Sequence, residues 1–493
     1  MKVKIVLAII ISMLGMVPFS ALVDAQDFSN EWTAPELLYL VTDGQRSNYL
    51  SILSDQAEKL YTWWMTFNAY PEEPTADQIK SMTFHTQNLG GNWRSPTDVM
   101  ISPDAGRMAA VVIDSDGLLH AFFATHCLNY ATAKHDQAMS ARSWNIVGCL
   151  DKVGNAYPSA VQTPDGTIFV VYAALENHSY RLIHSQDGGS SWSAYRTVLE
   201  IEDNFLLDPM MAADQMGRLH LVWSVGQAPD GYPPMGVYYS RSDNEGISWT
   251  APIQLGGLDE GQPAIAVFND DVHVLWNGDA EKRGRYYRYS PDSGESWSSV
   301  EVLSPPSSQG GEGGLQRPPA IVVDNVGNVH VLLHEQDALY YATKSDFVWS
   351  TKQALYNPVL MKGVEIFGVR LGITGGDTLH ALYILESYDQ SIEEDRRNHI
   401  WRVFHQSTEI NSISSTPIPW STPLPDVAGN DETPEVSLEI GTNPVEKPQS
   451  INFQNNVERE NNNNPAWPIY LGIISVSIFI LGLLFLFFFQ QRR

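Results

Sequence analysis

SQDGGSSW at Ser185–Trp192, SDNEGISW at Ser242–Trp249 and SPDSGESW at Ser290–Trp297 are three copies of one short pattern. The pattern is S-x-[D/N]-x-G-x-S-W, and a degenerate copy, TQNLGGNW, lies at Thr86–Trp93. The Asp or Asn side chain can accept backbone N–H groups of a turn, the first serine can cap that turn, and the glycine can adopt a positive φ. We therefore expect hairpin turns whose tryptophan packs on a neighbouring sheet. The fixed residues are Ser185, Asp187, Gly189 and Trp192, then Ser242, Asn244, Gly246 and Trp249, then Ser290, Asp292, Gly294 and Trp297.

The tryptophans extend this repeat beyond the three copies. Trp93, Trp144, Trp192, Trp249, Trp297 and Trp349 are spaced by 51, 48, 57, 48 and 52 residues. A repeat of about 50 residues that holds several short apolar runs is typical of a four-stranded propeller blade. The runs come in pairs across turns rich in Asp, Asn and Gly, as in PSAVQTPDGTIFVVYA (Pro158–Ala173), which is hairpin chemistry.

The two ends of the repeat region complete each other. The last copy, at Phe367–Ile384 and His399–Gln406, lacks a fourth strand, whereas WTAPELLYL at Trp32–Leu40 is similar to WTAPIQL at Trp249–Leu255. An N-terminal strand that closes the last blade would leave no open sheet edge. We therefore predict an all-β propeller over residues 27–406 with seven four-stranded blades, and six blades as the alternative count.

The repeated pattern resembles the Asp-box, or BNR repeat, of sialidases and related propellers. In that family the boxes lie between the third and fourth strands of a blade, at the rim, and ligands sit over the central channel. The resemblance therefore implies that Asp187, Asn244 and Asp292 are structural residues. It also implies that the functional site lies at the crossings from one blade to the next.

The same resemblance implies a set of candidate catalytic residues. Sialidases hold a carboxylate with three arginines, because the planar guanidinium matches it bidentately, and they use a Glu-activated Tyr as nucleophile with an Asp as acid/base. Arg46, Arg317 and Arg370 could supply the clamp, and Tyr383 with Glu365 the nucleophile pair. Asp208 is the candidate acid, with Asp104 as its alternative. The family's Arg-Ile-Pro signature near the first inner strand is absent.

Several other chemistries are excluded by what the chain lacks. It contains no H-E-x-x-H, G-x-S-x-G or Walker motif, and two cysteines cannot build a zinc cage, so we expect no metal or cofactor. The formal net charge of −27 argues against nucleic acid as a partner, because phosphate binding needs a basic surface.

The two cysteines are Cys127 and Cys149. Cys127 is expected to begin the third strand of its unit and Cys149 to end the fourth, so antiparallel pairing could bring them together as one disulfide. Two unpaired buried thiols are the alternative.

Sequence patterns at both ends of the chain predict export and membrane anchoring. Residues 1–25 have the layout of a cleaved signal peptide, with an uncleaved anchor as the alternative. Residues 407–466 are rich in Ser, Thr, Pro and Asn and predict a disordered stalk. Residues 467–489 carry no charge and are long enough to cross a bilayer, and the following residues 490–493 end in two arginines, which predicts a cytoplasmic tail.

Together these features predict a monomeric extracellular domain held at the cell membrane by a single span. The expected function is a surface module that binds a glycan or a protein, and the alternative is an exo-acting glycosidase of the sialidase superfamily on terminal sugars. The sequence leaves open whether the chain is an enzyme. Asn177-His178-Ser179 permits N-glycosylation in a host that has the machinery.

Overall fold

The computed structural model describes residues 32–417, apart from residues 42–44, 69–80, 103–106, 125–126, 153–156, 175–177, 230, 232, 279–283, 305–318, 336–337, 357–363 and 388–399. The predicted signal peptide, the membrane segment at 467–489 and the tail lie outside the described residues, as does all but the start of the stalk. Within the described part of the chain, no helix is long and apolar enough to cross a membrane.

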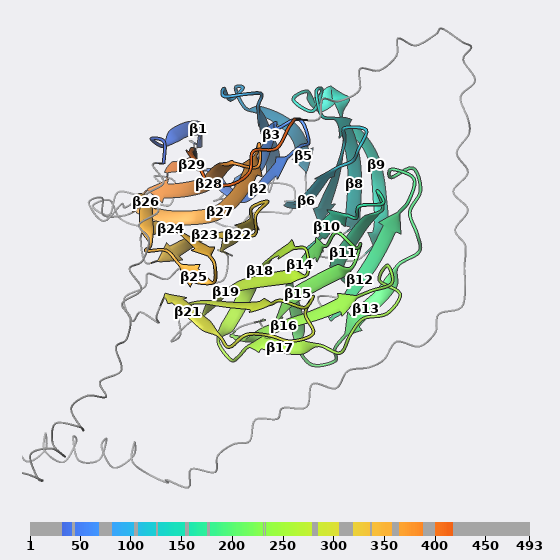
Figure 1. Ribbon diagram of the computed structural model, residues 1–493. Coiled ribbons are helices and arrows are strands. Elements are labelled where there is room, and N and C mark those ends of the chain that lie inside the picture. Colours follow the sequence, from blue (N-terminus) through green and yellow to red (C-terminus); the bar gives the residue numbers. More distant parts are fainter. Residues whose placement is uncertain are drawn as a thin grey trace, which may run out of the picture. The chain divides into compact units, whose positions relative to one another are not determined.

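The described residues form seven antiparallel sheets, which we call blades 1 to 7 (Figure 1). The strands of blades 1 to 3 are β2 Gln45–Ser54, β3 Leu60–Asn68, β4 Ser81–Asn88 and β5 Thr97–Ser102; β6 Arg107–Ile113, β7 Leu118–Ala124, β8 Cys127–Lys134 and β9 Asn145–Lys152; and β10 Ser159–Gln162, β11 Ile168–Ala174, β12 Ser179–Ser185 and β13 Arg196–Glu200. Those of blades 4 and 5 are β14 Phe205–Ala213, β15 Leu219–Gly226, β16 Pro234–Ser242 and β17 Ile253–Gly256; and β18 Glu260–Phe268, β19 Asp271–Gly278, β20 Arg285–Ser290 and β21 Glu301–Ser304. Blade 6 holds β22 Ala320–Val323, β23 Val329–Glu335 and β24 Ala338–Ser345, with β25 Val348–Trp349 and β26 Gln353–Tyr356 sharing its outer place; blade 7 holds β27 Val364–Thr374, β28 Thr378–Ser387, β29 Ile400–Glu409 and β1 Glu36–Val41.

The sheets close into a ring. Each first strand contacts the first strand of the next blade, and β27 of blade 7 contacts β2 of blade 1. Strand β1 pairs antiparallel with β29, so the N-terminal segment supplies the fourth strand of the last blade. The predictions of seven blades and of an N-terminal strand that closes the last one are thus confirmed, and the alternative count of six is wrong.

The strand order sends successive connections to opposite ends of the blades. We call the end with the first hairpin turns and the turns between third and fourth strands the box face. The other end carries the loops between second and third strands and the crossings from one blade to the next, and we call it the crossing face.

The Asp-boxes on the box face have the predicted geometry. Asp187 Oδ1 accepts the backbone N–H of Ser191 at 2.9 Å, and Ser185 Oγ accepts that of Gly189 at 2.8 Å. The equivalent bonds of Asn244 and Asp292 lie at 2.9 and 2.8 Å. The box glycines Gly189, Gly246 and Gly294 have φ values of 81, 73 and 88°.

Each box also locks onto the blade before it. Trp192 meets Tyr130 edge-on at 5.1 Å between ring centroids, and Trp297 meets Tyr239 at 4.8 Å. A Cβ at Gly294 would overlap the Tyr239 hydroxyl, which donates to the Ser293 carbonyl at 3.1 Å. The box is therefore an inter-blade joint as well as a turn.

Most first hairpins carry an acid at one place. Asp55, Asp114, Asp214 and Asp324 each accept two backbone N–H groups of their own turn. Thr163 and Thr374 stand at this place in blades 3 and 7. We refer to these six as the turn residues, because they provide a common frame for comparing blades.

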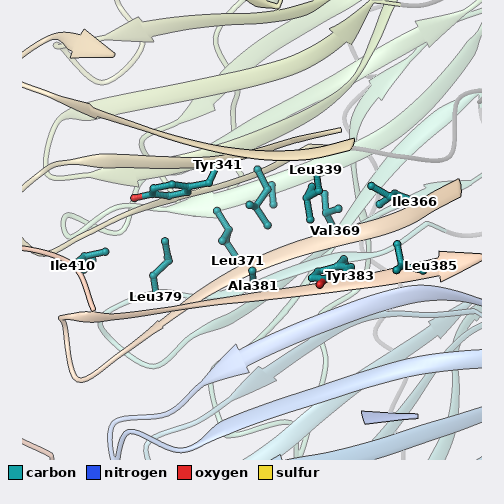
Figure 2. Close-up of a cluster of buried hydrophobic side chains, with 12 residues drawn as sticks. Leu339, Tyr341, Ile366, Val369, Leu371, Leu379, Ala381, Tyr383, Leu385 and Ile410 are labelled. Atoms are coloured by element: carbon teal, nitrogen blue, oxygen red, sulfur yellow. The ribbon is translucent and has the colours of Figure 1, made fainter. Parts of the chain in front are cut away.

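Between the blades lie packed apolar clusters. Figure 2 shows the cluster between blades 6 and 7, where Leu339 and Tyr341 of β24 face Val369 and Leu371 of β27 and Tyr383 of β28. On blade 2, Cys127 and Cys149 are joined by a disulfide with their Cα atoms 5.5 Å apart.

Candidate functional site

A chain of polar side chains crosses from blade 4 to blade 5 on the crossing face. Ser224 Oγ lies 3.5 Å from Asp208 Oδ2 and accepts the backbone N–H of Gln262 at 2.8 Å. Asn277 Nδ2 donates to Gln262 Oε1 at 2.9 Å. Asp208 and Gln262 are on first strands and Ser224 and Asn277 on second strands. The two blades thus share one hydrogen-bonded group of acid, hydroxyl and amides.

Asp208 is the titratable member of this chain. Its side chain is partly exposed, and burial raises its pKa to about 6, which the bond from Ser224 only partly opposes. The nearby Tyr180 hydroxyl donates to the Leu207 carbonyl at 3.0 Å, and burial followed by the charge of Asp208 raises the pKa of Tyr180 well above its usual value. An acid with a pKa near neutral, with one long hydrogen bond, can accept or donate a proton at physiological pH.

The backbone at Asp208 and Gln262 is strained. Their φ values are 53 and 56°, and each residue precedes a proline, Pro209 or Pro263. Bulky L-residues rarely adopt positive φ, and a following proline further restricts the backbone. Such strain persists only where the surrounding structure imposes it, and it concentrates at functional sites.

Glu260 braces the start of β18. Its Oε2 accepts the indole N–H of Trp276 at 2.9 Å and the backbone N–H of Gly257 at 3.0 Å, and the residue is 8 % exposed. These bonds fix the crossing from blade 4 and so hold the backbone that leads to Gln262.

Arg370 is an unbalanced cation on blade 7. Its Nη1 donates to the Val369 carbonyl at 2.8 Å, and no carboxylate of the described residues pairs with it. Burial lowers the pKa of Arg370 to about 10, since its desolvation is not offset by an acid. A partly exposed guanidinium with spare donors can accept an anionic group.

The other predicted site residues lie as follows. Tyr383 is fully buried in the cluster of Figure 2, and its hydroxyl donates to Gln406 Oε1 at 2.8 Å, so the structure places it as a core aromatic away from solvent. Arg46 is on β2 and Glu365 on β27, but their side chains are not among those described. Arg317 and Asp104 lie outside the described residues. Of these candidates, only Asp208 and Arg370 have described side chains on first strands.

Sequence reasoning missed Ser224, Gln262 and Asn277. A usable signal was present, because Asp208 and Gln262 each stand directly before the proline that opens an apolar run. No three His, Cys, Asp or Glu side chains of the described ranges gather as metal ligands.

Several solved structures are similar to this chain at low sequence identity. One is an ulvan lyase of polysaccharide lyase family PL25 bound to -[GlcA(1-4)Rha3S]-, with 10% identity and a TM-score of 0.50 over 74% of this chain and 95% of that one. A protein of unknown function from Dyadobacter fermentans has 11% identity and a TM-score of 0.48 over 76% and 99%. The NanB sialidase of Streptococcus pneumoniae has 11% identity and a TM-score of 0.42 over 77% and 71%. At these identities the likeness concerns the fold alone.

The curated proteins contain no match to the chain. The family model described as "BNR repeat-containing family member" matches residues 61–355, which is more than half of the sequence. This stretch runs from β3 to β26 and includes all three complete Asp-boxes. The chain therefore belongs to the BNR repeat-containing family, and its described residues form a β-propeller.

Proposed function

We propose that this propeller binds carbohydrate at its crossing face, at the polar chain of blades 4 and 5. The carrying observation is Asp208, a desolvated acid on strained backbone whose described hydrogen bonding consists of one long contact to Ser224. A sugar hydroxyl would donate to this carboxylate and restore the solvation that burial removes. The ulvan lyase of the same fold was solved with a bound sugar, which supports carbohydrate as the ligand class.

The experiment is a glycan-binding measurement on the full-length chain in detergent micelles. An array of neutral and acidic oligosaccharides should identify at least one ligand, and titration calorimetry should give its affinity. Asp208→Asn keeps the shape of the side chain but removes a charged acceptor, so we expect about tenfold weaker binding. The matched control is Asp243→Asn, which removes an exposed acid of the box face that pairs with Arg241.

The control variant should bind as the wild type does. Equal weakening by both variants would show that overall charge matters rather than this site. The absence of any bound oligosaccharide would refute carbohydrate binding at the crossing face.

A second candidate function is cleavage of a glycosidic bond, and the elevated pKa of Asp208 favours it. A carboxylic acid with a pKa of about 6 can protonate a leaving-group oxygen near neutral pH. Arg370 would hold an anionic group of the substrate. Because Tyr383 is fully buried, this reading needs a nucleophile other than Tyr383, or an activated water.

Release of the fluorophore from a 4-methylumbelliferyl sialoside tests this candidate. Activity that is lost in both Asp208→Asn and Arg370→Lys, and that falls in the wild type as pH rises through about 6 because Asp208 must be protonated to act as the acid, would support cleavage. Absence of release by the wild type would refute sialidase activity and leave binding as the function.

We also propose that the propeller is displayed outside the cell on a single membrane span. The support is the sequence pattern of residues 1–25 and 467–489 and the arginines after it. Protease added to intact expressing cells should remove an epitope tag placed after residue 26 and spare one placed after Arg493. Protection of both tags would contradict surface display.

A further inference from the structure

One position on the crossing face can be compared across six of the blades among the described residues. It lies six residues before the turn residue, which gives Tyr49, Met108, Tyr157, Asp208 and Gly368 in blades 1, 2, 3, 4 and 7. Blade 5 has a shorter first hairpin, and strand register assigns Gln262 to the position there, since Gly261 pairs with Asn277 as Leu207 pairs with Ser224. We call these six residues the bulge ring.

The backbone singles out this position. Tyr49, Asp208 and Gln262 have φ values of 56, 53 and 56°, and Gly368 has 23°. Outside hairpin turns and Asp-boxes, the described non-glycine residues with positive φ are these three and Asp259. Positive φ at a side-chain-bearing residue therefore coincides with one structural place in three different blades.

The cause of the unusual backbone is a β-bulge. Register shifts lie between Asn48 and Ser51, between Leu207 and Met210, and between Gly261 and Ala264, so that the ring residue has no pairing partner on the second strand. A bulge re-aims the side chain at that point and is over-represented beside functional sites. Because strained backbone concentrates at functional sites, the same strain in three blades suggests that this position has a function.

The side chains of the bulge ring differ in type from blade to blade, whereas the neighbouring positions of the first strands are similar. Tyr49 and Tyr157 are partly exposed aromatic members, Asp208 is a partly exposed acid, and Gln262 is a buried amide at 3 % exposure. By contrast, the residue two places further along is small in most blades, as at Ser51, Ser159, Ala264 and Ala320. The variation therefore concentrates at the ring position.

We propose that the bulge ring is the specificity-determining surface and that it selects an uncharged sugar, with Tyr49 and Tyr157 contacting sugar C–H faces and Asp208 accepting a hydroxyl. This inference rests on the proposed carbohydrate binding and adds the ligand class and the residues that read it. A rigid tyrosine offers apolar contact area at low entropic cost, and a carboxylate is a strong acceptor for a hydroxyl.

Charge decides between neutral and acidic sugars. Asp208 is a carboxylate without a cationic partner among the described residues, and Gln262 beside it is neutral. An anionic group placed at this acid would meet like charge in a poorly solvated place, which is unfavourable. Arg370, the unbalanced cation, belongs to blade 7 and lies two residues beyond the ring position at Gly368.

The test compares neutral oligosaccharides of glucose, galactose and mannose with their uronic acid counterparts on one array, with the full-length chain in micelles at pH 7.5. We expect stronger binding to the neutral series, with losses of about fivefold in Tyr157→Ala and about tenfold in Asp208→Asn. Phe347→Ala is the aromatic control, because Phe347 is 75% exposed at a hairpin tip of the box face. Unchanged melting temperatures would show that each variant folds.

The outcomes separate the inference from the proposed function. Binding that needs the carboxylate of the uronic acid, or that is weakened by Asp208→Asn but indifferent to Tyr157→Ala, would overturn the bulge ring while leaving carbohydrate binding at Asp208 in place. Binding that is indifferent to both variants would overturn the bulge ring and the Asp208 site together. Absence of binding to every neutral and acidic sugar would overturn carbohydrate binding itself.

Discussion

Two aspartates of blade 4, six residues apart, have opposite environments. Asp214 on the box face accepts the backbone N–H groups of Met216 and Arg218 at 2.8 and 2.9 Å, and it also contacts the Arg218 side chain and His220 Nε2. Asp208 on the crossing face has one contact of 3.5 Å, from Ser224. Both are desolvated, but the pKa of Asp214 is lowered because its hydrogen bonds outweigh burial, whereas burial raises that of Asp208 to about 6.

The difference arises because Asp214 belongs to a hydrogen-bond network of several side chains that joins neighbouring blades. On the box face, His220 Nδ1 lies 2.8 Å from the Tyr239 hydroxyl, and that hydroxyl reaches the Asp-box of blade 5. Because a carboxylate can only accept, His220 Nε2 carries the proton towards Asp214. Blades 2 and 6 repeat this Asp–His–Tyr relay. In blade 4, protein groups hold the acid of the box face in several hydrogen bonds, whereas the acid of the crossing face has one long contact.

The largest expected effect on stability comes from disrupting the contact between an Asp-box and the preceding blade. Gly294→Ala places a Cβ onto the Tyr239 hydroxyl in addition to straining a φ of +88°, so we expect a loss of about 3 kcal/mol or more in unfolding free energy. Gly166→Ala is the matched control, with a φ of +89° and nothing within 4 Å, and should lose about 1–2 kcal/mol. Urea unfolding of both variants measures the difference, and equal losses would show that the inter-blade contact is unimportant.

The two aspartates should respond to the same substitution with opposite signs. Asp214→Asn replaces the carboxylate that accepts the buried hydrogen bonds by a weaker acceptor. It should lower the unfolding free energy by about 2–3 kcal/mol at pH 7. Asp208→Asn removes a desolvated charge, and Asn tolerates positive φ, so it should stabilise by about 1–3 kcal/mol while weakening ligand binding. Destabilisation by Asp208→Asn would contradict the raised pKa.

The effect of Asp208→Asn on stability should depend on pH. The folded pKa of about 6 exceeds the ordinary aspartate pKa of 3.8, so the wild-type side chain contributes least to stability above pH 6. It recovers its contribution as pH falls through 6 towards 4. The advantage of Asp208→Asn should therefore be present at pH 7 and shrink to nearly zero at pH 4. Taking the difference between the two proteins cancels the histidines, whose lowered pKa values destabilise the fold in acid.

The smallest expected effect concerns Ser224. Ser224→Ala removes the contact that lowers the pKa of Asp208 and the acceptor of the Gln262 N–H, so the pKa of Asp208 should rise by about half a unit and stability fall by about 1 kcal/mol. Carboxyl NMR titration of Asp208 measures the shift. A downward shift would show that Ser224 does not donate to this acid.

The fold could be predicted from the sequence because its determinants are local. Each Asp-box contains its own acceptor, cap and glycine, and the tryptophans repeat with the blade period. The N-terminal strand was predictable for a related reason, since WTAPELLYL repeats the segment after a box.

The site was harder to predict because it depends on contacts between blades. Ser224 joins Asp208 to Gln262 from positions 16 and 38 residues away, and no local pattern encodes those contacts. The arginine clamp was inferred from family resemblance. Of its three arginines, only Arg370 has a side chain among those that the structure describes. Tyr383 looked like other tyrosines in sequence, but all of β28 from Leu379 to Glu386 is buried.

The most direct test of the carbohydrate site is an experimental structure of the full-length chain with its best array ligand bound. We expect sugar density on the crossing face, with a hydroxyl within about 3 Å of an Asp208 carboxylate oxygen. Density on the box face, or density at the crossing face that makes no contact with Asp208, would contradict it.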